Sequence, residues 1–227
     1  MPEIDLWRCS LALTPADQNR CLKTLNPGEL ERAGRQTRQP ARDYFIAARG
    51  QLRLILGYYL PIRPADLEFA AHPNGKPYLI GQTLYFNLSH SQDRMALAVS
   101  KLDRIGVDIE ALAPRSGLHK LAQRCLSAAE FEGWSQTPPA QQLSLFYSLW
   151  TQKEAFMKAV GRGLALGLKE CEFSLHPKTA LHRIPAAYGL AKDWQVMEFP
   201  AGHGYAGALA APAGALQIAI RDRQDGY

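Results

Sequence analysis

The stretch IGVDIE (residues 105–110) constrains the fold most tightly, because it alternates aliphatic residues with a glycine and two acids. A period of two is typical of a β-strand with one apolar face. The three aliphatic side chains then share one face, and Asp108 and Glu110 share the other. Like charges on one strand face repel. Either water solvates both acids on an outer face, or a positive group lies between them.

The bulk composition is that of an ordinary globular chain. The 227 residues are 47% hydrophobic and 21% charged, which allows one large domain or two small ones. No apolar run approaches the roughly 20 residues that span a bilayer, and the first residues do not resemble a secretory signal. We therefore expect a cytoplasmic protein with no membrane contact. Its widely spaced cysteines are expected to be reduced thiols: Cys9, Cys21, Cys125 and Cys171.

Much of the net charge of +5 lies in one segment, residues 32–53, where Asp43 is the only acid. Such a patch favours an anionic partner, which could be a phosphorylated small molecule, a nucleic acid or an acidic protein. A solvated helix face is the more common explanation of any single arginine, whereas for the group the two explanations are equally good. The patch consists of Arg32, Arg35, Arg38, Arg42, Arg49 and Arg53.

The order of local patterns predicts an α+β protein with two similar halves that meet near residues 100–104. Helix-start signals and helical spacing predict helices from residue 14 toward 25, from 26 toward Pro40, and over 41–59. Alternation and turn residues predict strands over 83–91, 94–100 and 104–110. Further helices are expected over 118–126, from the Ser127 capping box, and over 141–160. The last predicted strands are 170–175, 194–199, 204–211 and 216–222.

The long helix carries WTQKEAFMKAVGRGL, in which Glu154 and Lys158 lie four residues apart on one face. An exposed i,i+4 ion pair is the common explanation of such spacing, and it contributes only about 0.2–0.5 kcal/mol. The glycines at 161 and 163 could form a phosphate-binding turn, but a helix stop is the simpler explanation.

A third pattern, NGKPYL followed by FNLSHS, places Lys76 on a tight turn and His90 between two serines. Neighbouring residues on a strand point apart, so Ser89 and His90 are poorly placed to act as nucleophile and base on each other. Contact of Lys76 and His90 with a phosphate fits better. A purely structural histidine is the alternative.

In order and spacing, NGKP, FNLSHS, IGVDIE and WTQKEAFMKAVGRGL together resemble the successive motifs of the 4′-phosphopantetheinyl transferases. The chain length and the segment FYSLWTQKEAFMK are similar to those of the Sfp-type subfamily. The resemblance runs from about Asn26 to Leu164. It implies transfer of the phosphopantetheine arm of coenzyme A to a serine of an apo acyl or peptidyl carrier protein, with release of 3′,5′-ADP.

The resemblance also implies a role for individual residues. Mg²⁺ would be bound by Asp108, Glu110 and Glu154, with Glu154 helping to deprotonate the serine and Lys158 stabilising the transferring phosphate. Lys153 would have a lesser, orienting role. The coenzyme A contacts would be Arg49, Arg53, Lys76, Ser89, His90 and Lys158, with Arg32 a weaker candidate.

The implied architecture is a pseudo-dimer of residues 1–103 and 104–227, with coenzyme A in the cleft between the halves and the carrier at residues 111–142. A chain of this length is expected to be a monomer. A nucleic-acid partner is not expected, because the basic residues are not interleaved with exposed aromatic ones. The alternative function is a non-catalytic coenzyme A or nucleotide-binding module.

Overall fold

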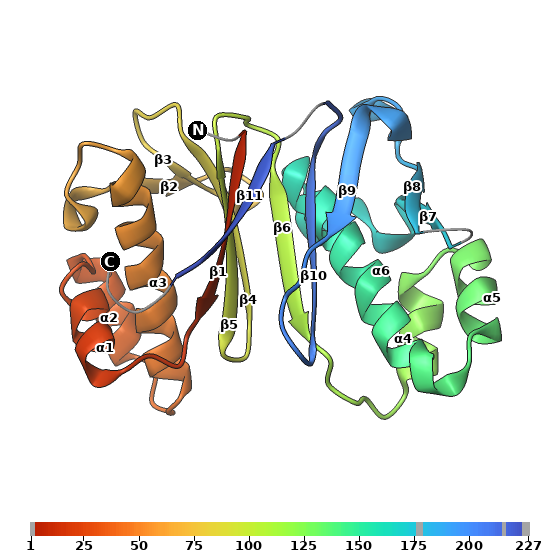
Figure 1. Cartoon of the computed structure of the whole chain (residues 1–227), viewed down its shortest axis with the longest axis horizontal. Coiled ribbons are helices and arrows are strands. Elements are labelled where there is room, and N and C mark those ends of the chain that lie inside the picture. Colours follow the sequence, from red (N-terminus) through yellow and green to blue (C-terminus); the bar gives the residue numbers. More distant parts are fainter. Residues whose placement is uncertain (1–2, 176–178, 215–216, 224–227) are drawn as a thin grey trace.

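The computed structural model describes residues 3–175, 179–214 and 217–223, and its elements come in two series. The first series begins with strand β1 and ends with strand β5 (Figure 1). Its elements are β1 (Ile4–Ser10), α1 (Pro15–Leu22), α2 (Pro27–Gly34), α3 (Ala41–Tyr59), β2 (Phe69–Ala71), β3 (Pro77–Leu79), β4 (Tyr85–Ser91) and β5 (Arg94–Ser100).

The second series repeats this order, with one strand, three helices, a short hairpin and two longer strands. Strand β11 (Ile218–Asp222) follows it. The second series consists of β6 (Gly106–Ala111), α4 (Leu118–Cys125), α5 (Ala128–Gln136), α6 (Pro139–Ala159), β7 (Glu172–Ser174), β8 (Ala180–Arg183), β9 (Trp194–Glu198) and β10 (Tyr205–Pro212).

The two main sheets have matching strand orders, β1-β5-β4 and β6-β10-β9, and both pair their strands antiparallel. Figure 1 shows the sheets side by side at the centre, with α1–α3 on one outer side and α4–α6 on the other. The predicted α+β fold of two similar halves is therefore confirmed at the level of topology. The first series ends and the second begins between Ser100 and Gly106.

Strand β11 departs from the predicted division at residues 103 and 104. It returns from the second half and pairs in parallel with β1, so the first sheet has the order β11-β1-β5-β4. Arg8 fixes the pairing with a bidentate contact to Asp222, at 2.8 and 2.7 Å. By hydrogen bonding, residues 218–222 belong to the first half. Residue 216 of the predicted strand lies outside the described residues.

Two other elements differ from the sequence predictions. Strand β1 was not predicted, and it lies inside the first sheet with Asp5 fully buried. Helix α2 was predicted to run toward Pro40 but ends at Gly34. Glycine has a low helix propensity, so the helix ends there before the proline is reached.

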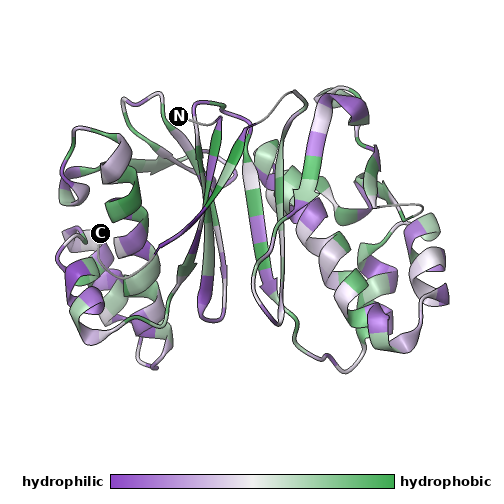
Figure 2. Cartoon of the chain, viewed as in Figure 1, coloured by the Kyte–Doolittle hydropathy of each residue, from purple (hydrophilic) through white to green (hydrophobic). Residues whose placement is uncertain are grey.

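The two sheets pack against each other through a shared apolar core. Ile105, Val107 and Ile109 lie in it, as the alternation predicted, together with Ile4 and Leu6 from β1. In Figure 2 hydrophobic residues recur along these central strands, whereas the outer helices carry much of the hydrophilic surface. The junction between the halves is therefore a buried, fixed contact rather than an open hinge.

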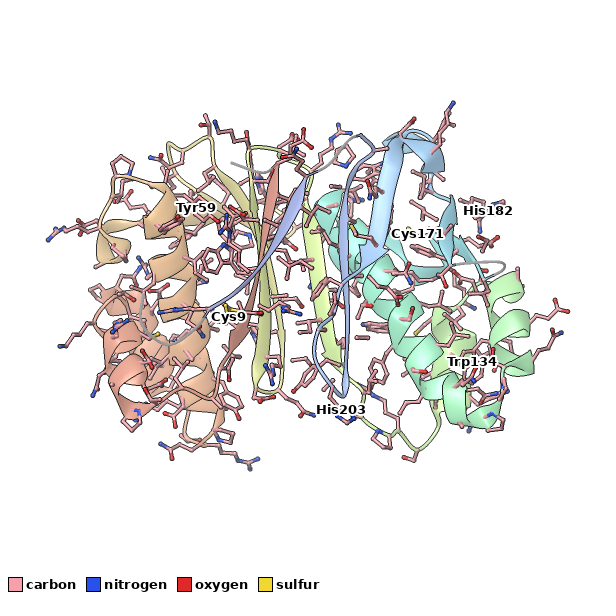
Figure 3. All side chains as sticks on the ribbon, in the orientation of Figure 1. Cys9, Tyr59, Trp134, Cys171, His182 and His203 are labelled. Carbon is pink, nitrogen blue, oxygen red and sulfur yellow. The ribbon has the colours of Figure 1, made fainter. Side chains whose placement is uncertain are left out.

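Each half also has its own core between sheet and helices. Leu52 and Leu56 of α3 pack on the first sheet, and Phe156 and Met157 of α6 pack on the second. All four cysteines are buried and free, which is consistent with the predicted thiols; Figure 3 shows Cys9 in the first half and Cys171 in the second. Among the described residues no helix is long and apolar enough to cross a membrane.

The backbone of α6 lies directly on β6 at Gly106. A Cβ at this position would lie 2.0 Å from the carbonyl oxygen of Ala155 and 2.4 Å from the nitrogen of Ala159. Both neighbours are helix backbone, so the clash cannot be relieved by a change of rotamer. The glycine of IGVDIE therefore permits the helix to approach the strand that carries the acids.

We predict that Gly106→Ala lowers the free energy of unfolding by about 3 kcal/mol or more, because the added methyl group forces helix and strand apart. Gly34→Ala is the matched control, since a Cβ there meets no atom within 4 Å. Urea denaturation of both variants measures the difference. Equal stability of the two variants would contradict the close approach of α6 and β6.

Candidate active site

Helix α6 places Lys158 against the acid-bearing face of β6. The Lys158 ammonium contacts the Asp108 carboxylate at 2.7 Å, the Ser89 hydroxyl oxygen at 2.9 Å and the Val107 carbonyl oxygen at 3.2 Å. All three N–H donors of the ammonium are therefore engaged. Ser89 in turn donates to the same Asp108 oxygen at 2.7 Å. Three predicted site residues, from β4, β6 and α6, thus meet at one carboxylate.

Two buried carboxylate oxygens beside this contact have no hydrogen-bond partner. They are Asp108 Oδ2 and Glu154 Oε1. Leaving such groups unpaired costs free energy, and native proteins keep unpaired buried groups rarely and often at functional sites. Within the described ranges no group of three or more His, Cys, Asp or Glu side chains is arranged as a closed metal site. Oxygen donors with free lone pairs are nevertheless the ligands that Mg²⁺ prefers, so this donor set fits that ion.

The electrostatics of Glu154 reflect the crowding of negative charge. Burial and then the charge of Asp108 raise the pKa of Glu154 to about 7, against the opposing effect of Lys158. Burial also raises the pKa of Glu110, although its hydrogen bond from Ser91 acts in the other direction. The two acids and Asp108 are thus close enough to repel one another, and Lys158 supplies a positive charge near all three.

Lys153, next to Glu154, faces the opposite way and is fully buried. Its ammonium donates to the Glu130 carboxylate at 2.6 Å and to the Leu168 and Cys171 carbonyl oxygens at 2.8 and 2.7 Å. The second Glu130 oxygen accepts from the Phe173 amide at 2.8 Å. This satisfied network fixes the rotation of α6 about its axis. The predicted capping box at Ser127 is confirmed, but its sequence did not indicate that Glu130 also binds Lys153.

Lys76 and His90 approach the junction of the halves from the first half. The Lys76 ammonium donates to the Ile105 carbonyl oxygen at 2.9 Å, and burial lowers its pKa to about 8. Lys76 also lines a cavity of about 410 Å³, together with His72, Tyr78, Arg104 and residues at the end of α6. Desolvation, and then the charge of Lys158, lower the pKa of His90.

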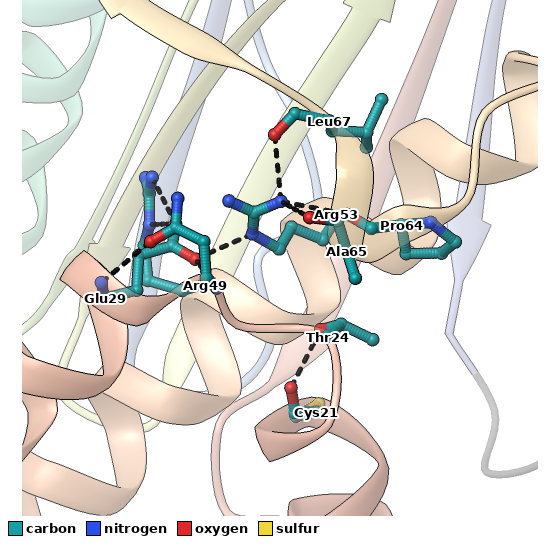
Figure 4. Close-up of polar contacts among 9 residues, drawn as sticks. Cys21, Thr24, Glu29, Arg49, Arg53, Pro64, Ala65 and Leu67 are labelled. Carbon is teal, nitrogen blue, oxygen red and sulfur yellow. Dashed lines mark hydrogen bonds and ion pairs between the residues drawn. The ribbon is translucent and has the colours of Figure 1, made fainter.

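Arg49 and Arg53 form a buried network of their own around Glu29 (Figure 4). Arg53 is fully buried and donates to Glu29 at 2.7 Å and to the carbonyl oxygens of Pro64, Ala65 and Leu67. Arg49 binds the other Glu29 oxygen, at 2.7 Å, and keeps a partly exposed side chain. Burial favours a higher pKa for Glu29, but the Arg53 hydrogen bond and the Arg49 charge outweigh it and lower the pKa.

This placement separates two residues that were predicted to act alike. In this structure the Arg53 guanidinium joins α3 to α2 and to residues 64–67, while Arg49 reaches the surface. Contact of Arg49 with a ligand phosphate stays a prediction. For Arg53 the structure instead supports a role in holding the helices together, although its Nη2 atom has no partner. Arg32, the weaker candidate, lies over the Phe45 ring.

Comparison with known proteins identifies a family for this chain. The model of the 4′-phosphopantetheinyl transferase superfamily matches residues 104–210, which include β6 and α6. The chain is 38% identical over 200 residues to the 4′-phosphopantetheinyl transferase HetI of Nostoc sp., covering 86% of this chain and 82% of that protein. It is 36% identical over 138 residues to the 4′-phosphopantetheinyl transferase AcpT of Escherichia coli O157:H7, covering 60% and 66%.

A solved structure, the holo-[acyl-carrier-protein] synthase of Thermotoga maritima, aligns with 48% of this chain and 62% of that chain, at 20% identity and a TM-score of 0.39. The named relatives are transferases of one family. From the extent of its similarity to HetI, the chain belongs to the 4′-phosphopantetheinyl transferase family. The family resemblance seen in its motifs is thereby confirmed.

The raised pKa of Glu154 predicts how stability depends on pH in the metal-free protein. Between pH 4.5 and about 7 the folded state keeps a proton that the unfolded chain releases, so the contribution of Glu154 to stability falls as pH rises. Glutamine does not titrate, so Glu154→Gln removes this fall in stability with rising pH. At pH 8 the variant should be more stable than the unchanged protein by up to about 3 kcal/mol.

Denaturant unfolding from pH 5 to 8 in the presence of EDTA measures the effect as the difference between the two proteins at each pH. Glu68→Gln, on the exposed surface, is the control. Parallel stability profiles for Glu154→Gln and the unchanged protein would show that Glu154 titrates normally.

Proposed function

We propose that this chain transfers the 4′-phosphopantetheine group of coenzyme A to a serine hydroxyl of an apo acyl or peptidyl carrier protein, with Mg²⁺ bound by Asp108, Glu110 and Glu154. The observation that carries the proposal is the pair of unpaired buried oxygens, Asp108 Oδ2 and Glu154 Oε1, in a chain of this family. When bound, the divalent ion would neutralise the acids and withdraw charge from the pyrophosphate.

The reaction forms one phosphorus–oxygen bond and breaks another. The serine oxygen bonds to the phosphorus that carries pantetheine, the bond from that phosphorus to the bridging oxygen breaks, and 3′,5′-ADP leaves with the electron pair. The serine proton passes to Glu154. Glu154 would take the proton directly or through a water molecule, and its place beside Asp108 and Lys158 puts it where the serine and the phosphate would meet.

Lys158 would act on the transferring phosphate as a positive charge. Its ammonium already lies 2.7 Å from Asp108, so a phosphate entering beside the acids would meet it without a large movement of the helix. The rate gain would come mainly from the orientation of the two substrates and from electrostatic stabilisation.

Coenzyme A carries phosphate groups, which would be contacted by polar and basic residues of the first half. Lys76, His90 and the exposed part of Arg49 are the proposed contacts, and the cavity beside Lys76 is a site for another part of the ligand. Ser89 and Lys158 would take part through the contact that they share at Asp108. Arg53 would support these contacts from within by holding α3 in place.

The carrier is proposed to dock at residues 111–142, which run from the end of β6 through α4 and α5 to the start of α6. Carrier recognition helices are acidic, and a chain with a net charge of +5 suits them. We propose a monomer, because the two halves already supply β4 and α6 to one site within a single chain. A cytoplasmic location remains a prediction.

Intact-mass measurement of an apo carrier protein after incubation with this chain, coenzyme A and Mg²⁺ tests the function. We expect the carrier to gain one phosphopantetheine group, and EDTA to prevent the gain. Asp108→Ala and Glu154→Ala should lower the rate at least about 100-fold while the fold is kept, because each removes a proposed metal ligand. Glu68→Ala is the matched control on the exposed surface.

Intact-mass measurement together with calorimetry distinguishes the transferase from the alternative, a coenzyme A-binding module without catalysis. Such a module would bind coenzyme A in calorimetry equally well with and without Glu154 and Lys158, and no carrier in a varied panel would gain mass. Coenzyme A binding without any mass gain would therefore reject the transferase proposal.

A further inference from the structure

Strand β4 presents a row of polar side chains to β6. Asn87, Ser89 and Ser91 alternate along the strand with Phe86 and Leu88, which pack into the core of the first half. The three polar residues therefore share the other face. That face meets β6, although β4 and β6 are end strands of different sheets and are not joined by a backbone ladder.

Side chains of this row take over the hydrogen bonds that a neighbouring strand would make. Asn87 accepts from the Val107 amide at 2.7 Å, and Ser91 accepts from the Ala111 amide at 3.1 Å. Two backbone donors of β6 are thus satisfied by β4 side chains rather than by carbonyl groups. The row fixes the position of β6 along its length, with the acids between the two contacts.

The Ser91 hydroxyl both accepts and donates a hydrogen bond. Because its oxygen accepts from the Ala111 amide, its single proton is free for Glu110, and the distance from Ser91 Oγ to Glu110 Oε2 is 2.8 Å. Ser89 repeats the pattern, since it accepts from Lys158 and donates to Asp108. Each serine therefore holds one acid of IGVDIE in a single orientation.

We infer that Ser91 is a positioning residue that aims Glu110 at the metal site, and that Asn87 supports it by fixing β6. The inference rests on the proposed role of Glu110 as a metal ligand. Ser91 itself is not proposed to touch the metal or coenzyme A, because its proton and one lone pair are already used. Groups that orient metal ligands in this way commonly change metal affinity 10- to 100-fold when removed.

Mn²⁺ binding to the full chain with coenzyme A present, followed by electron paramagnetic resonance, tests the inference without any turnover. We expect Ser91→Ala to weaken Mn²⁺ binding about 10- to 100-fold, and Ser91→Thr, which keeps the hydroxyl, to stay within about 3-fold of the unchanged protein. Thermal unfolding of each variant confirms that it is folded.

Ser148→Ala is the matched control, because Ser148 also donates to a glutamate, Glu198, but on another part of α6. Its Mn²⁺ affinity should not change. If Ser91→Ala binds Mn²⁺ as tightly as the unchanged protein, the positioning role is wrong and the proposed metal ligands stand. If the unchanged protein binds no Mn²⁺, both the metal ligands and the role of Ser91 are wrong.

Discussion

The backbone contact between α6 and β6 at Gly106 determines the rest of the site. It brings a helix that carries Glu154 and Lys158 onto a strand that carries Asp108, at a separation that any side chain at residue 106 would prevent. The buried Lys153–Glu130 pair then fixes the rotation of α6. Replacing such a pair by apolar residues is often neutral for stability, so its value here lies in the defined orientation of the helix.

The acids are held from the other half of the molecule. Ser89 and Ser91 of β4 each donate to one acid of β6, and Lys158 of α6 forms an ion pair with Asp108. Burial, and after it the negative charge of Asp108, raise the pKa of Glu154 in this arrangement. The acids therefore repel one another in the absence of a cation. Binding of a cation at the site would relieve this repulsion.

The local elements could be predicted from sequence because their signals come from neighbouring residues. The alternation in residues 105–110 and the helical spacing of 141–160 each report on one element, and both were confirmed. The clustering of Asp108 with Lys158 was accessible only through the order of the family motifs, since the two residues are 50 positions apart.

Long-range partners left no comparable signal. Glu29 forms a capping box with Asn26 at the start of α2, which explains this glutamate without Arg53, so nothing in the sequence showed that Arg53 is buried against it. The alternation in β11 predicted a strand, but its pairing with β1, at the other end of the chain, depends on the packing of two whole halves. Strand β1 was missed because Asp5 is polar in sequence yet buried beside Tyr59 and Arg221.

The central claim is that the free oxygens of Asp108 and Glu154 are the metal-binding atoms of a site assembled from both halves. A crystal structure with Mn²⁺ and coenzyme A, analysed by anomalous diffraction at the manganese edge, tests it directly. We expect one strong anomalous peak in contact with Asp108 Oδ2 and Glu154 Oε1, with Ser91 still bound to Glu110. A peak elsewhere, or bound coenzyme A without a peak at these acids, would contradict it.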